Sequence, residues 1–344
     1  MTDRARPCPD CNHDADAVHR REFLKIAGVA AAAAGTWPGL SRAEDAKSPA
    51  AETAVKLLYD SLNEAQKKEV CYEWDFQDPK RGHLRTRISN NWHINDRVID
   101  SDFYTNDQKR IIRDIFEGIY HPDWHARLDQ QLKDDAGGYG KSQNIAIFGQ
   151  PGSDKFEFVM TGRHMTIRCD GNTTENVCFG GPIFYGHAAR GFDEAPDHPG
   201  NVYWPQALQA NQVFSMLDGK QRAAALVANL PEENAVGFRT DVRPGIPLSE
   251  LSADQMGQVE KTLAMLVEPY RQSDRDEVAA CLKAQGGLEQ CSLAFYKEGD
   301  LGNDSVWDCW RLEGPSFVWY FRGEPHVHVW VNIASDSQVK INPA

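Results

Sequence analysis

Hydrophobic residues recur at helical spacing in several parts of the chain. Apolar side chains return every three or four positions, as they do on one buried face of a helix. These patterns cover residues 52–69, 105–120, 122–136, 205–230 and 252–283. Thr105 or Asn106 is suited to cap the second of these helices, and Pro122 to begin the third, which ends at Gly137.

Short apolar runs bounded by turn residues predict strands in two other regions. In the middle of the chain, NIAIFG and FEFVMTGRHMTIRC flank the turn QPGSDK, which favours a hairpin, and VCFGGPIFYG is typical of a further strand. Near the C-terminus, SVWDCWRL, SFVWYFRG and HVHVWVNIA are joined by EGP and GEP. These connections are short enough to force an antiparallel meander.

Strands and helices are grouped in separate stretches of the chain. This grouping favours the α+β class, with an antiparallel sheet that combines the C-terminal meander and the central hairpin and packs with several helices. We expect a single domain over residues 44–344, because roughly 300 residues can bury a large core.

The first 43 residues resemble a twin-arginine signal peptide. Arg20 and Arg21 precede EFLKIAG and then an Ala-rich apolar run, and the small residues of SRA favour cleavage after Ala43. The apolar run is about ten residues long, whereas a membrane-spanning helix needs about 20, so we expect no membrane anchor. The chain is therefore predicted to use the twin-arginine export machinery and to be periplasmic or secreted.

The net charge of the chain argues against some classes of binding partner. The chain carries 50 acidic and 37 basic residues, a formal net charge of −13. Nucleic acids and anionic membrane surfaces select for Lys and Arg, so this excess of acid argues against both. We expect the ligand to be a small molecule or a component of the cell envelope.

The number of cysteines favours disulfide bonds. Of the 8 cysteines, Cys8 and Cys11 fall in the leader, and an even number follows it, as is common in exported proteins. The disulfides expected are Cys169–Cys178, Cys281–Cys291 and Cys71–Cys309, because the first two pairs bracket stretches that can reverse the chain. The alternative is that some of these residues are buried thiols, which pack as small apolar side chains.

The stretch GEPHVHVWVN combines a strand pattern with two histidines. In a strand, His326 and His328 point to the same face, about 7 Å apart, and two imidazoles at that spacing can bind one metal ion. The other face carries only valine and isoleucine, so it is expected to be core. Trp330 on the histidine face argues against simple exposure of that face.

Two further histidines are candidates for the same site. His164 is expected in mid-strand within TGRHMTIRCD, and His187 follows a strand within IFYGHAARGF. If the sheet brings them beside His326 and His328, neutral imidazoles converge, and such donors suit Zn²⁺ or copper better than Mg²⁺ or Ca²⁺. The expected metal ligands are therefore His164, His187, His326 and His328.

Three other polar residues are candidates for catalysis. Arg168 and Arg190 are expected to orient an anionic substrate, and Tyr185 to donate a proton. With zinc the site would activate water for hydrolysis, and with copper it would support oxidation or binding. The first hypothesis is thus an exported metalloprotein of unknown substrate.

A second hypothesis is a non-enzymatic binding protein of the periplasm or envelope. Its ligand platform would be formed by the aromatic residues of the tail, Trp307, Trp310, Trp319, Tyr320 and Trp330. The competing interpretation is that these side chains form the core of a sheet. The sequence leaves open whether the chain is an enzyme.

The export signal, the Gly162 and His164 pair of the central hairpin, and the C-terminal His-x-His strand together resemble one family. It is the exported bacterial family catalogued as domain of unknown function thirty-five hundred, and the resemblance covers most of the chain after the leader. Arg163 stands where a second histidine is expected in that family. The resemblance implies no established reaction, so the function has to be argued from the residues.

Overall fold

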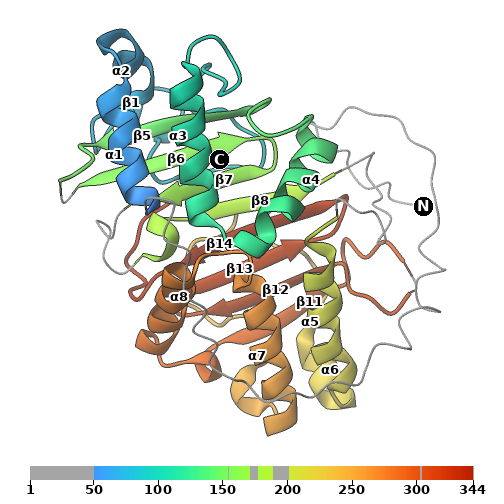
Figure 1. Ribbon diagram of the computed structural model, residues 1–344. Helices are drawn as coiled ribbons and strands as arrows, with labels where there is room; N and C mark the ends of the chain where they lie inside the picture. Colours follow the sequence, from blue (N-terminus) through green and yellow to red (C-terminus); the bar gives the residue numbers. More distant parts are fainter. Residues whose placement is uncertain (1–49, 154, 171–176, 189–200, 303, 344) are drawn as a thin grey trace.

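The computed structural model describes residues 50–153, 155–170, 177–188, 201–302 and 304–343, which form an α+β fold (Figure 1). The predicted export signal lies outside these residues and stays a prediction. Among the described helices, none has the length and apolar character needed to cross a membrane.

The helices occupy the predicted regions, but three of those regions each contain two helices. Their bounds are α1 Ala51–Ser61, α2 Glu64–Val70, α3 Asn106–Ile119, α4 His125–Ala136, α5 Trp204–Met216, α6 Gly219–Ala225, α7 Ala253–Val267 and α8 Gln272–Ala284. The first region is interrupted because the side chain of Asn63 accepts a hydrogen bond from the Gln66 N–H and so caps a new helix. Thr105 caps α3, as predicted.

Eleven of the described strands form one sheet in the order β1-β5-β6-β7-β8-β14-β13-β12-β11-β10, with β9 beside β11. The bounds of its longer strands are β5 Gln143–Gly149, β6 Phe156–Gly162, β7 Met165–Cys169, β8 Ile183–His187, β11 Ser292–Tyr296, β12 Cys309–Gly314, β13 Phe317–Arg322 and β14 Val327–Ile333. The two-residue strands are β1 Cys71–Tyr72, β9 Leu226–Val227 and β10 Ile246–Pro247 in this sheet, and β2 Gln77–Asp78, β3 Gly82–His83, β4 Arg87–Ile88 and β15 Asn342–Pro343 outside it.

The sheet is larger than predicted and is mixed. The central hairpin and the C-terminal meander are both present, and the antiparallel pairing of β8 with β14 joins them into one sheet. Two pairs at the margins, β1 with β5 and β9 with β11, are parallel. The predicted α+β class is therefore confirmed, but the predicted antiparallel pairing does not hold throughout the sheet, because the short strands β1 and β9 add parallel pairs.

The described helices cover one face of the sheet (Figure 1). The main core lies between them and the strands, and it includes Val327, Val329 and Val331 of β14, so the prediction that the valine face is core is confirmed. On the opposite face, irregular segments replace helices. Trp92 packs there over β5 and β6, and Val236 packs over β12–β14.

The aromatic residues of the tail are largely core residues. Trp310, Trp319, Tyr320 and Trp330 are at most 2 % exposed, and only Trp307 is partly exposed. Because their rings are packed inside the protein, the predicted aromatic ligand platform is wrong for these four residues.

None of the predicted disulfides is formed among the described cysteines. The Cys169 thiol interacts instead with Glu52, and the Cys291 thiol accepts a hydrogen bond from Gln285. The predicted partners Cys169 and Cys178, and Cys281 and Cys291, are close in sequence, but proximity in sequence did not bring their thiols together.

Candidate metal centre

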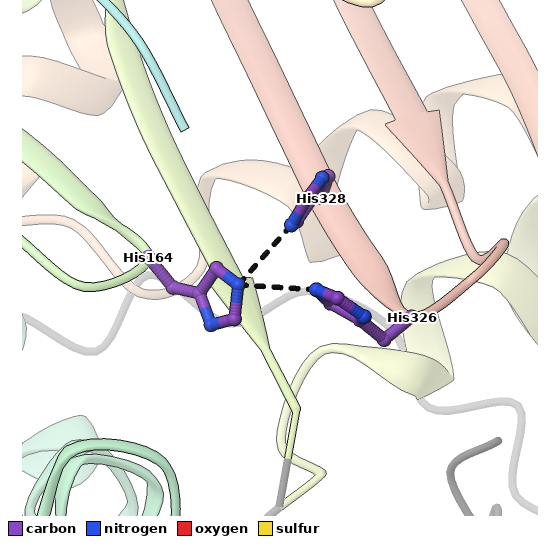
Figure 2. A group of neighbouring side chains, drawn as sticks. All are labelled: His164, His326 and His328. Atoms are coloured by element: carbon purple, nitrogen blue, oxygen red, sulfur yellow. Dashed lines mark hydrogen bonds between the residues drawn. The ribbon is translucent and has the colours of Figure 1, made fainter. Parts of the chain in front are cut away.

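Three buried histidines from two separate parts of the chain meet at one point. The Nε2 atom of His164 lies 3.1 Å from Nε2 of His328 and 3.2 Å from Nε2 of His326 (Figure 2). The three side chains offer nitrogens that all lie within 4.8 Å of one another, and each residue is at most 2 % exposed. Among the described residues, this is the one group of three or more His, Cys, Asp or Glu side chains that could hold a metal ion.

The strand β14 supplies two of these histidines. His328 lies within the strand and His326 directly precedes it, so both side chains project from the face opposite the valines. This is the face covered by irregular segments, where the ring of Phe184 packs 5.4 Å from that of His328 and 4.7 Å from that of Trp330. The histidine face is therefore a second buried layer.

His164 reaches the site from a tight turn. It was predicted in mid-strand, but the structure places it with Arg163 between β6 and β7, where Gly162 pairs with Met165. The φ angle of His164 is 48°, an uncommon value for a residue with a side chain, and its N–H donates to Asn91 Oδ1 at 3.0 Å. The reversal of the chain aims the imidazole across β8 toward β14.

Gly186 provides the space for the His164 ring. In the ladder it lies opposite His328. A Cβ atom at this position would be 2.4 Å from the carbonyl oxygen of Val327 and 3.3 Å from two ring carbons of His164. The absence of a side chain at Gly186 is therefore a condition for the close approach of His164 to His328.

Two carboxylates contact the Nδ1 atoms of His164 and His328, the ring nitrogens that do not face the other histidines. Asp135, at the end of α4, lies with Oδ2 2.7 Å from Nδ1 of His164, and Glu233 lies with Oε1 2.5 Å from Nδ1 of His328. Asp135 also pairs with Arg163 and accepts the N–H of Ala188. A histidine that binds a metal typically donates its other N–H to such a carboxylate.

The charges of these groups fix the imidazole tautomers. Burial alone would raise the pKa of Asp135, but attraction to His164 and Arg163 and the hydrogen bond from His164 lower it. Burial would also raise the pKa of Glu233, but the hydrogen bond from His328 and the nearby Arg322 lower it to about 2. Both carboxylates are therefore ionised at neutral pH and accept hydrogen bonds, so each Nδ1 is the N–H donor.

It follows that Nε2 of His164 and of His328 each carries a lone pair. Burial lowers the pKa of His164 and that of His326, and repulsion from the neighbouring histidines lowers both further. Burial thus disfavours a proton held between the rings. Lone pairs on two nitrogens 3.1 Å apart repel each other. A cation bound by both nitrogens would replace this repulsion with attraction.

The distances fit one ion. Two imidazole nitrogens bound to a tetrahedral zinc ion at about 2.0–2.1 Å each lie roughly 3.3 Å apart. The distances of 3.1 and 3.2 Å from Nε2 of His164 to the other two Nε2 atoms are close to this value. Three histidines would leave a fourth position for water or substrate, as in catalytic rather than structural zinc sites.

His187 was predicted as a possible fourth ligand. It is buried and lies opposite Val327 in the ladder, so its side chain shares the face of Val327 and not that of His328. It is close enough to Asp135 and His326 to influence their pKa values, but it does not belong to the group of three. Its role as a ligand stays a prediction.

The other predicted site residues lie in different surroundings. Arg168 is buried in an ion pair with Glu157 and donates to the Pro182 carbonyl oxygen. Tyr185 lies on the helix-covered face, where its hydroxyl donates to Gln206 and accepts from Trp319. Both side chains are thus engaged in the protein interior, and this placement gives their predicted catalytic roles no support.

Arg190 lies outside the described residues, so its predicted role in orienting a substrate stays a prediction.

Sequence reasoning missed the residues that support the histidines. Asp135 lies in the last turn of α4, with one residue between it and two glycines, and Glu233 lies in a polar loop. In the sequence, neither setting distinguishes a carboxylate that supports a site from an ordinary surface carboxylate. The φ > 0 turn at His164 also has no signal in the sequence. Gly186, in the strand pattern of IFYGH, was the one available hint, because a glycine inside a strand marks a close approach.

Comparison with known proteins identifies the family and nothing more specific. No curated protein and no solved structure showed significant similarity to the chain. One family model, described as "Protein of unknown function (DUF3500)", matches residues 44–331, a range that includes all three histidines. The match covers most of the chain and agrees with the resemblance seen in the sequence. The chain therefore belongs to the DUF3500 family.

Proposed function

We propose that this protein is an exported metalloprotein that binds one Zn²⁺ or Cu²⁺ ion through Nε2 of His164, His326 and His328. The observation that carries the proposal is the convergence of these nitrogens, while Asp135 accepts a hydrogen bond from Nδ1 of His164 and Glu233 accepts one from Nδ1 of His328. A hydrogen-bonded core cluster would instead pair donors with acceptors.

The donor set favours a transition metal. Neutral imidazoles suit zinc and copper, whereas Mg²⁺ and Ca²⁺ prefer oxygen ligands. With a divalent ion, the two carboxylates around the site would balance the added charge. Bound zinc would act as a Lewis acid and activate water for hydrolysis, and bound copper would support oxidation.

The residues of the chain would define the site around the ion. Asp135 and Glu233 would orient two ligands, and the turn at His164 would fix their separation. The cluster is enclosed by buried side chains such as Phe184 and Trp330, which would exclude bulk water and strengthen electrostatic interactions with a substrate.

Export is part of the proposal. The family match begins at residue 44, directly after the predicted cleavage position, which supports separation of the leader from the folded domain. Export in the folded state would let a metal be chosen before the protein leaves the cytoplasm.

Elemental analysis of the purified mature protein tests this function. We expect about one equivalent of zinc or copper per chain, in line with a three-histidine site. The double substitution His326→Ala and His328→Ala should abolish it, whereas His121→Ala, which alters a half-exposed histidine beside Asp123, should not. A wild-type protein that retains no stoichiometric transition metal after loading would overturn the proposal.

A further inference from the structure

A pair of buried thiols lies away from the metal centre. Cys178 begins the short 3₁₀ helix η4 (Cys178–Gly180), and Cys281 lies on α8. Val177, just before η4, forms a bridge with Ala334, which follows the end of β14, whereas His326 precedes the start of that strand. The thiols and the histidines are thus near opposite ends of β14, a seven-residue strand that spans about 20 Å.

Contacts between η4 and α8 bring these two cysteines together. The N–H of Phe179 donates to Glu277 Oε2 at 3.0 Å. Glu277 and Cys281 are four residues apart on α8, so they lie on the same face of the helix. Cys178, next to Phe179, is therefore placed beside Cys281, and their thiols share a side-chain hydrogen bond.

The position of η4 is fixed by more than one interaction. Phe179 has a φ of 61°, an uncommon value for an aromatic residue, and its ring packs 4.7 Å from that of Tyr270. Together with the hydrogen bond to Glu277, this contact holds the turn that presents Cys178 to α8.

Other described cysteines have different partners. The Cys169 thiol interacts with the carboxylate of Glu52, Cys291 accepts a hydrogen bond from Gln285, and Cys309 donates to the carbonyl oxygen of Gly299. Cys178 and Cys281 are therefore the pair arranged for a reaction between two thiols.

We propose that Cys178 and Cys281 form a redox-active dithiol, which closes to a disulfide when the folded protein meets a disulfide oxidant such as a thiol–disulfide oxidoreductase or oxidised glutathione. The Cys281 thiolate attacks one sulfur of the oxidant, and the other sulfur leaves as a thiolate. Cys178 then attacks the Cys281 sulfur of this mixed disulfide and releases the second thiol of the oxidant. Two protein thiols are oxidised, one disulfide of the oxidant is reduced, and the two protons pass to its thiolates.

The roles of the two sulfurs follow from their environment. The S–H of Cys178 donates to Cys281 and lowers the pKa of the Cys281 thiol, whereas burial raises the pKa of Cys178. Because the thiolate is the nucleophile, Cys281 attacks first. Both residues are buried, so the oxidant gains access when the contacts between η4 and α8 open locally.

The bond would tie together distant parts of the chain. About 100 residues separate the two cysteines, and closing a loop of this length reduces the conformational entropy of the unfolded chain strongly. A protein that folds before export can close only pairs that are already adjacent, which is the arrangement of Cys178 and Cys281.

Oxidation of the mature protein with oxidised glutathione at pH 8 tests the proposal. After alkylation and digestion, mass spectrometry should find one cross-link, between the peptides of Cys178 and Cys281, and two fewer alkylated thiols. The melting temperature should rise by on the order of 5 °C and return on reduction. Retention of all thiols, or a cross-link between a different pair, would overturn the proposal, and these readouts require only the wild-type protein.

Single substitutions identify the order of attack. Cys178→Ser should leave a glutathione adduct on Cys281, because the second step is lost, whereas Cys291→Ser should still form the cross-link. An adduct on Cys178 in Cys281→Ser with none on Cys281 in Cys178→Ser would contradict the assigned roles. Metal content of the same samples is a separate readout, since the thiol pair does not depend on the histidines.

Discussion

Nε2 of His164 and Nε2 of His328 lie 3.1 Å apart, although 164 positions separate the two residues in the chain. Each ring donates its Nδ1–H to an ionised carboxylate, so both Nε2 atoms present lone pairs to the same point. A fold that brings two such lone pairs together, and adds His326 beside them, has the arrangement of a cation site.

The first prediction concerns the carboxylate behind His164. Asp135→Asn should weaken zinc binding by about 10–100-fold, because an amide orients the imidazole less firmly and does not raise the basicity of Nε2. Competition with a chromophoric chelator measures this affinity. Asp134→Asn, which changes a neighbour bonded to Gln130, is the matched control and should bind zinc normally. Equal affinities in the two variants would contradict the role of Asp135.

The second prediction concerns Glu233, the carboxylate that contacts His328, whose substitution should also weaken metal binding. Glu233→Gln removes the charge next to His328, and we expect an affinity loss of about 10–100-fold. Since the pKa of Glu233 is about 2, this loss should be constant between pH 5 and 8. Calorimetric titration across that range measures it, with the exposed Glu232→Gln as control. A loss that disappears toward pH 5 would show that Glu233 is not the ionised partner assumed here.

The third prediction concerns the space that Gly186 leaves for the His164 ring. Gly186→Ala places a Cβ against the Val327 carbonyl and the His164 ring, so it should lower the free energy of unfolding by about 1–3 kcal/mol and displace His164 from its partners. Denaturant unfolding and metal titration measure the two effects. Gly257→Ala in α7 meets no atom within 4 Å and should stabilise the protein by about 1 kcal/mol. Gly186→Ala with unchanged stability and metal affinity would refute the packing argument.

The fourth prediction is a dependence of stability on pH. Burial raises the pKa of Glu277 from 4.5 to about 7. Its folded-state pKa is above its unfolded value, so its contribution to stability is complete below about pH 4.5 and is lost as the pH rises through 7. Between pH 5 and 8, the wild type should therefore lose on the order of 2 kcal/mol relative to Glu277→Gln. Urea unfolding of both proteins at several pH values measures the difference, and parallel curves would exclude this assignment.

The elements of the fold were largely predictable because they depend on local patterns. Thr105 caps α3, and EGP and GEP join the three C-terminal strands, since capping and short turns are set by neighbouring residues. The mixed character of the sheet was not predictable, because the parallel pairing of Cys71 with Ile147 depends on contacts across the chain.

The candidate site was likewise predictable where it depends on local patterns, and not where it depends on contacts between distant parts of the chain. The alternation of His326 and His328 with buried valines was readable from period-two spacing, and the structure places His164 beside them, as expected. Its turn at φ 48° and its link to Asp135 were not, because they arise from packing between α4 and the β6–β7 turn. Cys178 and Cys281 were assigned to the wrong partners, since sequence proximity gave no information on the contact of η4 with α8.

Anomalous diffraction at the zinc or copper edge, from crystals of protein loaded with one equivalent of metal, tests the central claim most directly. We predict a single peak at about 2.0–2.1 Å from Nε2 of His164, His326 and His328. A peak at another position, or no peak while the three imidazoles keep their present contacts, would contradict the account.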